Sequence, residues 1–303
     1  MRPLAVCALA AAVLLGARPI HAITVDGNLD ALYGPPLVLQ STASTMKGYP
    51  DGQANESLGE ELDGAYGFVS GGVLHLFLAG NLSFWWTLQG QTEWLPVDIF
   101  IDCVPGGEHQ LLANNPAPDP SYNLNNLAGL TFEAGFAADY WLSVGGNAYT
   151  FPHIQAYYGT LPTAGGGAGT FLGSTTAGTP GPLAGGSNPY GFQLALNDSN
   201  TAGVASGCGA ASGAGVASGI EWDIPLAAIG NPTGCINVCA FTSSGDHAHL
   251  LNQVLGPLPP GTCNLGAAAT VDFSSIPGSQ YFTICEATPT ARSTWGRLKA
   301  IYR

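Results

Sequence analysis

Residues 218–230 read Ser218-Gly219-Ile220-Glu221-Trp222-Asp223-Ile224-Pro225-Leu226-Ala227-Ala228-Ile229-Gly230, and this segment suggests the architecture of the protein. Its first half alternates apolar with acidic side chains, Ile220, Trp222 and Ile224 against Glu221 and Asp223. Such alternation is the period of a half-buried β-strand, with the acidic side chains on a solvated face. Pro225 then presets the backbone for a first helical position, and Gly230 can adopt the left-handed conformation that ends a helix. The stretch therefore predicts a strand that runs directly into one short helix.

Strand-like runs recur on both sides of this stretch, separated by turns rich in Gly, Pro and Asn. They cover residues 65–69, 73–79, 94–103, 130–136, 140–144, 191–196, 236–242 and 281–284. Residues 163–189 are a low-complexity Gly/Ala/Thr/Pro segment, which we expect to form one or more long loops. Many short strands without a long amphipathic helix predict an all-β protein. The expected fold is a two-layer antiparallel β-sandwich, jelly-roll-like, with long Gly-rich loops and one or two short helices.

Three segments are predicted along the 303 residues. Residues 1–22 have a basic start, an apolar stretch and a small residue at the end, as a secretory signal peptide does, and the stretch is too short to span a membrane. No other run of 18 apolar residues follows, so no transmembrane segment is expected. Residues 23–289 form the β-sandwich domain, and residues 290–303 a basic amphipathic C-terminal tail. We expect a secreted protein, extracellular or attached to the cell surface.

The predicted domain is strongly acidic. Between residues 23 and 289 Lys47 is the only basic residue against twenty acidic ones, a net charge of 1 − 20 = −19. Nucleic acid and anionic membranes are bound through clustered Lys and Arg, so both are excluded as partners. Neutral glycans and cations remain as ligand classes. The basic tail resembles short C-terminal sorting tails of exported bacterial proteins, which implies surface-sorting machinery as a partner; the alternative is a terminal helix docked on the acidic domain.

Six cysteines remain after Cys7 leaves with the signal peptide: Cys103, Cys208, Cys235, Cys239, Cys263 and Cys285. An even number in an exported chain predicts up to three disulfides, with the connectivity open. Zinc is the weaker interpretation because Cys235 and Cys239 have no second close pair.

Two segments together resemble a known family. Ile23-Thr24-Val25-Asp26-Gly27-Asn28-Leu29-Asp30 is similar to the opening I-x-I-D-G-x-x-D of family 9 carbohydrate-binding modules and their DOMON-like relatives. Residues 219–226 with Gly230 resemble the late E-x-x-I-P-L-x-x-L-G strand and helix of that family. The resemblance implies a jelly-roll-like sandwich, a structural Ca²⁺ and an aromatic-lined glycan site. Inserted Gly-rich loops and six cysteines depart from the family pattern, and no position matches its sugar-binding aromatics.

Candidate ligand residues come from two places in the chain. Asp26, Asn28 and Asp30 carry oxygen ligands at alternate positions, as calcium loops do, and the alternative is a plain turn. Trp86 and Trp94 could stack on the apolar face of a sugar ring, and the alternative is that they pack inside the protein. Trp141 and Trp222 are expected in the core.

Catalytic patterns are weak. The segment Asp246-His247-Ala248-His249 has the spacing of a metal-binding histidine pair but no third ligand, so we expect a polar surface loop. Two carboxylate pairs share strand faces, Glu221 with Asp223 and Asp98 with Asp102, and no nucleophile, zinc-protease or dinucleotide motif is present. The sequence therefore predicts an exported, non-catalytic β-sandwich that binds a glycan. The alternatives are a structural surface or matrix protein without a small ligand and, less favoured, a hydrolase acting on glycans.

Overall fold

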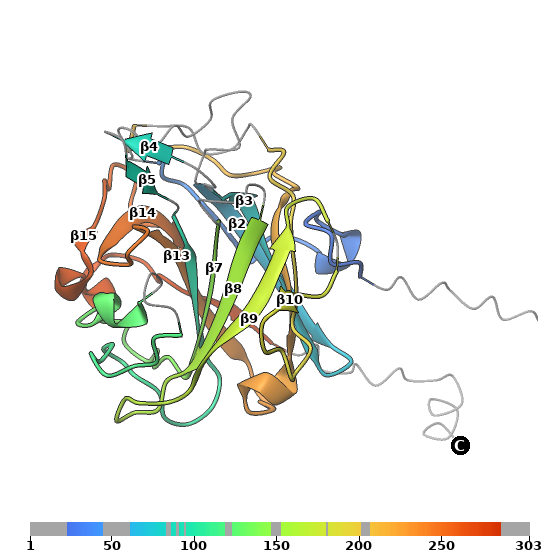
Figure 1. Ribbon diagram of the computed structural model, residues 1–303. Helices are drawn as coiled ribbons and strands as arrows, with labels where there is room; N and C mark the ends of the chain where they lie inside the picture. The colour runs from blue at the N-terminus through green and yellow to red at the C-terminus, as the bar shows by residue number, and fades with distance from the viewer. Residues whose placement is uncertain are drawn as a thin grey trace, which may run out of the picture.

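The computed structural model describes residues 23–44, 61–82, 86–88, 91–93, 95–118, 123–146, 153–179, 181–200 and 207–285. Two antiparallel sheets pack face to face in this part of the chain, so the predicted all-β sandwich is confirmed (Figure 1). The described helices are all short 3₁₀ turns: η1 (Ala31–Tyr33), η2 (Leu124–Leu127), η3 (Leu226–Ile229), η4 (Ala268–Thr270) and η5 (Phe273–Ser275). The predicted signal peptide and basic tail lie outside the described residues.

The smaller sheet contains residues 219–225 of the segment that suggested the architecture. Its strand order is β1 (Val38–Leu39), β2 (Glu61–Ser70), β3 (Val73–Asn81), β12 (Gly219–Pro225) and β11 (Gln193–Leu196). The β2–β3 hairpin turns at Gly71 and Gly72, whose φ angles of 60° and 82° suit the two-residue turn that glycine favours. Strand β12 runs through Pro225, and η3 then ends at Gly230, which has the left-handed conformation. The predicted strand and helix are confirmed, except that Pro225 closes the strand instead of starting the helix.

The larger sheet forms the second layer. Its order is β10 (Ala184–Gly185), β9 (Gly169–Thr176), β8 (His153–Thr160), β7 (Tyr140–Gly146), β6 (Val97–Asp102), β13 (Ile236–Ser243), β14 (His249–Leu255) and β15 (Gly266–Ala267), and β16 (Phe282–Ile284) also pairs with β13. A separate hairpin joins β4 (Trp86–Leu88) to β5 (Gln91–Glu93).

Two sequence expectations about strands are wrong. Strand β9 lies inside residues 163–189, where only loops were expected, because its small residues hide a strand that buries Leu172 in the core. Residues 130–136, expected as a strand, make only isolated bridges, and Phe132 and Phe136 instead pack under the larger sheet.

Three apolar clusters fill the layers. The main cluster lies between the sheets and contains Trp222, Leu76, Ile99 and Leu142, all fully buried. A second cluster covers the outer face of the larger sheet, where side chains such as Phe100 and Trp141 meet residues from the connections around η2, η4 and η5. A third lies on the outer face of the smaller sheet, where Tyr33 contacts Phe68 and Phe77. Both sheets are therefore covered on their outer faces as well, so alternating residues of one strand can all be buried.

Two of the three disulfides that six cysteines allow are present, Cys208–Cys263 and Cys235–Cys285. Cys103 and Cys239 are free thiols. Cys103 packs against the core between the sheets and Cys239 belongs to the cluster on the other face of the larger sheet, so the two side chains point away from each other. A third disulfide is excluded by this geometry.

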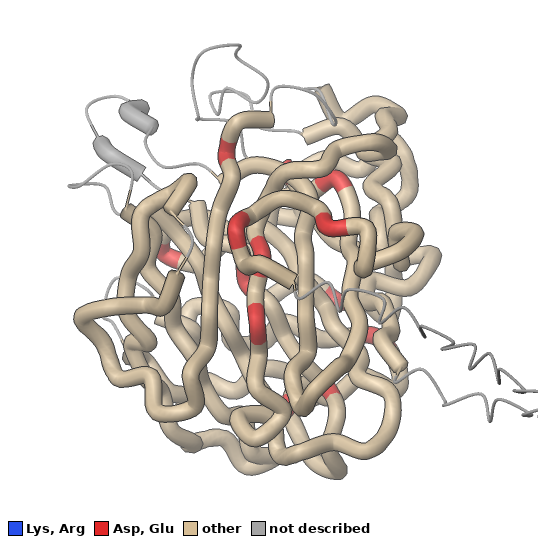
Figure 2. The backbone as a smooth tube through the Cα atoms, turned by 90° about the vertical axis from the view of Figure 1, so that its right-hand side faces the viewer, with Lys and Arg blue, Asp and Glu red and all other residues tan. Residues whose placement is uncertain are grey.

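All seven Lys and Arg residues lie outside the described part of the chain, as Figure 2 shows by the absence of blue. Histidine is therefore the only side chain there that can carry a positive charge. Among the described helices, none is long and apolar enough to cross a membrane.

Candidate functional site

A buried carboxylate joins the two segments that carry the family resemblance. Glu221 on β12 is fully buried, and its Oε2 accepts hydrogen bonds from the backbone N–H of Asp26 (2.8 Å) and of Gly27 (2.9 Å). The hydroxyl of Tyr33 donates to Oε1 at 2.9 Å. The expectation that Glu221 lies on a solvated face is therefore wrong, because the N-terminal segment covers that side of the smaller sheet.

Burial sets the acid–base properties of this junction. Burial raises the pKa of Glu221 to about 7, against the opposing effect of the two backbone N–H groups and the Tyr33 hydroxyl. Gly27 has a φ of +80°, and a Cβ atom at that position would collide with the backbone of Asn197. The close approach of the turn to the sheet thus requires glycine.

The predicted calcium ligands lie in the same turn. Asp26 Oδ1 accepts from the backbone and the side-chain amide of Asn28, at 2.9 and 3.1 Å. Asn28 Oδ1 in turn accepts from the amide of Asn197 at 2.7 Å. Asp30 precedes η1 without capping it by a side-chain hydrogen bond. These are the contacts of a hydrogen-bonded turn, and calcium binding by Asp26, Asn28 and Asp30 stays a prediction.

A different group of oxygen ligands converges at the ends of β2 and β3. The amide nitrogen of Asn200 lies 3.1 Å from Glu61 Oε1, 3.4 Å from Asp63 Oδ2 and 3.1 Å from Asn81 Oδ1. Its two hydrogens thus face three acceptors, and Glu61, Asp63 and Asn81 are buried. Carboxylate and amide oxygens are the ligands that hard cations such as Ca²⁺ prefer. Nowhere in the described residues do three or more His, Cys, Asp or Glu side chains gather as a metal site.

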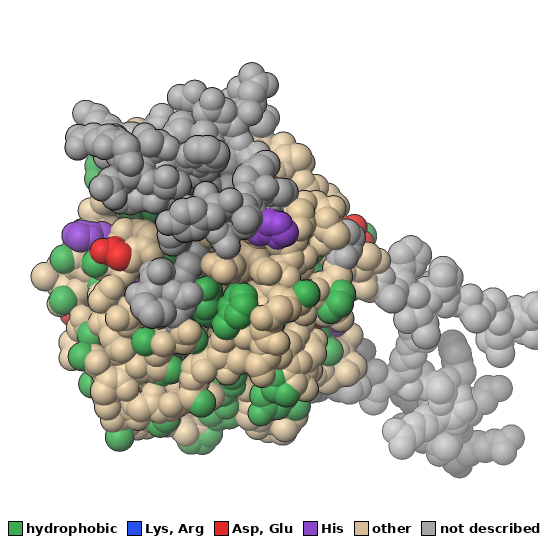
Figure 3. Space-filling view, in the orientation of Figure 1, with side chains coloured by type: hydrophobic (Ala, Val, Ile, Leu, Met, Phe, Trp, Pro, Cys, Tyr) green, Lys and Arg blue, Asp and Glu red, His purple; other side chains and the backbone are tan. Residues whose placement is uncertain are grey.

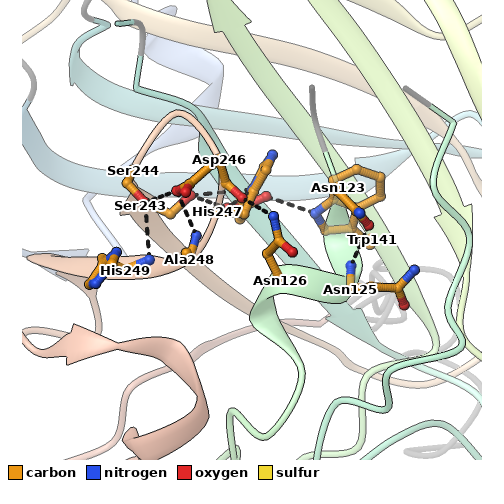
Figure 4. Close-up of polar contacts among 11 residues, drawn as sticks. Asn123, Asn125, Asn126, Trp141, Ser243, Ser244, Asp246, His247, Ala248 and His249 are labelled. Carbon is orange, nitrogen blue, oxygen red and sulfur yellow. Dashed lines mark hydrogen bonds and ion pairs between the residues drawn. The ribbon is translucent and has the colours of Figure 1, made fainter. Parts of the chain in front are cut away.

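A second buried network lies under the loop after β13 (Figure 4). Asp98 on β6 accepts from Trp141 Nε1 at 2.8 Å and from the hydroxyl of Ser243 at 2.6 Å, and His247 Nδ1 lies 2.9 Å from its Oδ2. All four side chains are fully buried. Because Ser243 and Asp98 approach the same ring nitrogen of His247, they do not form the serine–histidine–aspartate order of a hydrolase.

The loop that carries this histidine was expected at the surface, and the expectation is wrong for His247. Its backbone has a φ of +61°, stabilised by a turn in which Asp246 accepts from Ser244 and from the N–H of Ala248. Asn126 of η2 holds the turn from outside by donating to the carbonyl of Asp246. His247 is thereby turned inward while His249 stays exposed, so the two imidazoles do not form a metal pair.

The tryptophans predicted to bind sugar are only partly placed. The backbone of Trp86 lies in β4, paired with Glu93 of β5, and Trp94 lies outside the described residues. Trp141 and Trp222 are fully buried, as expected. On the face shown in Figure 3 the hydrophobic side chains of the described residues are scattered. The exposed large hydrophobic residues of the described chain are Leu32, Leu37 and Tyr190.

Comparisons of the chain with protein-family models, with curated protein sequences and with solved structures found no match. The family resemblance stays a prediction carried by the two quoted segments.

Proposed function

We propose that this chain is an exported β-sandwich binding module similar to family 9 carbohydrate-binding modules, with a neutral glycan as its ligand. The contact between Glu221 and the Asp26-Gly27 turn is the observation that supports the proposal most. These residues lie in the two segments of the resemblance and are more than 190 positions apart in the sequence. Their direct contact gives both segments one common role, because it holds the N-terminal segment on the outer face of the smaller sheet.

The proposed ligand site lies at the end of the sandwich that carries the β4–β5 hairpin. Trp86 and Trp94 would supply stacking faces for sugar rings. The ends of β2 and β3 lie at the same side as these loops in Figure 1, and there Glu61, Asp63, Asn81 and Asn200 concentrate polar groups. An end rich in acceptors and without Lys or Arg among its described residues favours hydroxyl-rich neutral ligands over anionic ones.

Calcium is proposed as a stabilising ion. The sequence places it at Asp26, Asn28 and Asp30, and the convergence of oxygens around Asn200 offers a second location. Asp26→Ala and Glu61→Gln, compared in thermal unfolding with Ca²⁺ and with EDTA, distinguish the two. The site that holds the ion is the one whose variant has the same unfolding temperature with Ca²⁺ as with EDTA. If the unaltered chain also has the same unfolding temperature under both conditions, calcium binding is refuted.

Glycan binding is tested with purified residues 23–303 on a polysaccharide array. We expect binding that Trp86→Ala or Trp94→Ala weakens by about tenfold or more, by analogy with the ~1–3 kcal/mol that stacking of one nucleobase on an aromatic ring contributes. Tyr190→Ala is the matched control, because it removes an exposed aromatic ring outside the proposed site. Absence of binding, or equal losses in all three variants, would refute the proposal and favour the structural surface protein. The assembly state of the chain at increasing concentration tests that alternative directly.

Export and sorting are proposed from residues 1–22 and 290–303. Expression of the full chain and of a chain ending at residue 289, followed by cell fractionation, tests both. A full chain retained inside the cell would refute export, and identical surface attachment of both chains would refute the sorting role of the tail.

A further inference from the structure

Three polar side chains lie in a row across the outer face of the smaller sheet, on three neighbouring strands. Ser70 ends β2, His75 lies on β3 and Asp223 on β12. The register pairs His75 with Asp223 on one side and with Phe68 on the other, and Ser70 points to the same face as Phe68 because side chains alternate along a strand. The row is therefore fixed by sheet pairing.

The contacts within the row have the order of a catalytic triad. His75 Nδ1 lies 2.6 Å from Asp223 Oδ1, and His75 Nε2 lies 3.5 Å from the hydroxyl of Ser70. The carboxylate and the hydroxyl thus use opposite nitrogens of the ring, unlike the Asp98–His247 network. This arrangement lets the carboxylate hold the ring orientation while the other nitrogen takes a proton from serine, and the serine–histidine distance is in the range that apo sites show.

We propose that Ser70, His75 and Asp223 form an acyl-transfer site that hydrolyses small neutral or cationic esters. The site goes beyond the proposed glycan binding and is independent of it. It also departs from the expectation of a non-catalytic chain, which rested on the absence of a Gly-x-Ser-x-Gly motif. Here sheet register, which no local motif records, brings the three residues together.

The surroundings of the row determine the class of substrate. Ser70 is exposed and the His75–Asp223 pair retains 12% and 14% exposure, so a substrate can reach the hydroxyl. The ring of Phe68 stacks on His75 with centroids 4.8 Å apart and offers an apolar wall for an acyl group. The charged groups on the covering N-terminal segment and on β12 are acidic, Asp26, Asp30 and Glu221, so anionic esters are disfavoured.

Backbone donors for the developing oxyanion are available beside the nucleophile. Within the described residues, Gly71 and Gly72 donate no hydrogen bond from the backbone. A Cβ atom built at either position would meet no atom within 4 Å, so there is free space beside this turn. Such N–H groups can stabilise the negative charge of a tetrahedral intermediate.

The reaction balances without a cofactor. Ser70 Oγ attacks the carbonyl carbon of RCO–OR′ while its proton moves to His75 Nε2, and the C–OR′ bond then breaks as that proton passes to the leaving alkoxide. Water attacks the acyl-serine, His75 takes a proton from it, and Ser70 regains a proton as RCOOH leaves. The products are one acid and one alcohol for each ester and water consumed.

The experiment uses residues 23–303 with p-nitrophenyl acetate as substrate and a fluorophosphonate as the covalent probe. We expect ester hydrolysis that Ser70→Ala and His75→Gln each lower by ~10²-fold, the contribution of a positioned general base. Asp223→Asn should lower the rate and shift its pH profile. Ser274→Ala and His109→Gln, which alter an exposed serine and histidine elsewhere, are the matched controls and should keep the full rate.

The probe replaces its fluoride by Ser70 Oγ, and a Glu-specific protease then releases the labelled residue in the fragment between Glu61 and Glu93. Label on Ser70 that His75→Gln abolishes supports the site. Hydrolysis unchanged in Ser70→Ala, or label spread over several serines, would overturn it. Circular dichroism of each variant shows whether it is folded, and only the rates of folded variants are compared. If Ser70→Ala does not fold, Ser70→Thr takes its place, because it keeps a hydroxyl and changes the side chain less.

Discussion

The buried Glu221 should make the stability of this protein depend on pH between about 4.5 and 7. Its pKa is about 7 in the folded chain against an ordinary value of 4.5, so the folded state binds the proton more tightly than the unfolded state does. The unfolding free energy therefore falls as the pH rises through this window and is level above it. At about 1.4 kcal/mol per pH unit over about 2.5 pH units, the loss has an upper bound of about 3.5 kcal/mol.

Glu221→Gln isolates this effect because the amide is neutral at every pH. Its carbonyl oxygen can still accept from the Asp26 and Gly27 N–H groups, and its NH₂ can donate to the Tyr33 hydroxyl. We expect the variant to match the unaltered chain near pH 4.5 and to exceed its stability by up to about 3.5 kcal/mol at pH 8. Tyr33→Phe removes a hydrogen bond that favours the ionised carboxyl, so the window should extend to higher pH.

Urea unfolding at half-unit steps from pH 4 to 8 measures these differences. The difference between variant and unaltered chain is the quantity to read, because Asp139 and Asp198 also have pKa values raised by burial and add their own slope. A difference that stays constant across the window would mean that Glu221 does not titrate there, which contradicts a pKa of about 7.

Three further outcomes follow from the packing. Trp141→Phe should destabilise the chain by ~1–3 kcal/mol more than Trp222→Phe in urea unfolding. The ring nitrogen of Trp141 donates to the buried carboxylate of Asp98, whereas the ring nitrogen of Trp222 has no partner among the described residues. Equal losses of stability in the two variants would contradict this prediction. When residues 23–303 are unfolded without reductant and alkylated, two cysteines should be labelled, Cys103 and Cys239. A mass that corresponds to no alkylated cysteine, or to six, would disprove the disulfide pattern. Gly80→Ala should lower the free energy of unfolding by about 2–4 kcal/mol in thermal unfolding, because its φ of +143° disfavours a side chain and the new Cβ would collide with the backbone of Glu61 on β2. An unchanged unfolding temperature would argue against the β2–β3 register at Gly80.

The architecture followed from alternation and turn chemistry. The apolar residues of 220–224 lie in the core, and Gly230 ends η3 in the conformation that the sequence predicts. These features are local, so neighbouring residues are sufficient to predict them. Strand β9 was missed because its two apolar residues, Phe171 and Leu172, are adjacent and surrounded by Gly, Thr and Ser, so they show no alternation.

The polar residues were harder to place, because a strand pattern does not tell what covers its second face. Glu221 alternates with core residues and was expected in solvent, yet the N-terminal segment, far away in the sequence, buries it, and distant segments likewise bury Asp98. The same holds for His247, whose inward orientation depends on a turn held by Asn126. The Ser70, His75 and Asp223 row likewise depends on the pairing of strands 148 residues apart, which no local motif expresses.

The confinement of Lys and Arg to the two ends of the chain and to Lys47 has a practical and a biological consequence. Trypsin-like proteases cut only after these residues, so they find no peptide bond to cleave between Lys47 and Arg292. This resistance to tryptic cleavage is a property of the sequence, so unfolding does not remove it. Exported as proposed, the chain would keep residues 48–292 as one covalent piece among tryptic proteases outside the cell, and amine-directed crosslinkers would find no Lys side chain other than Lys47 and Lys299.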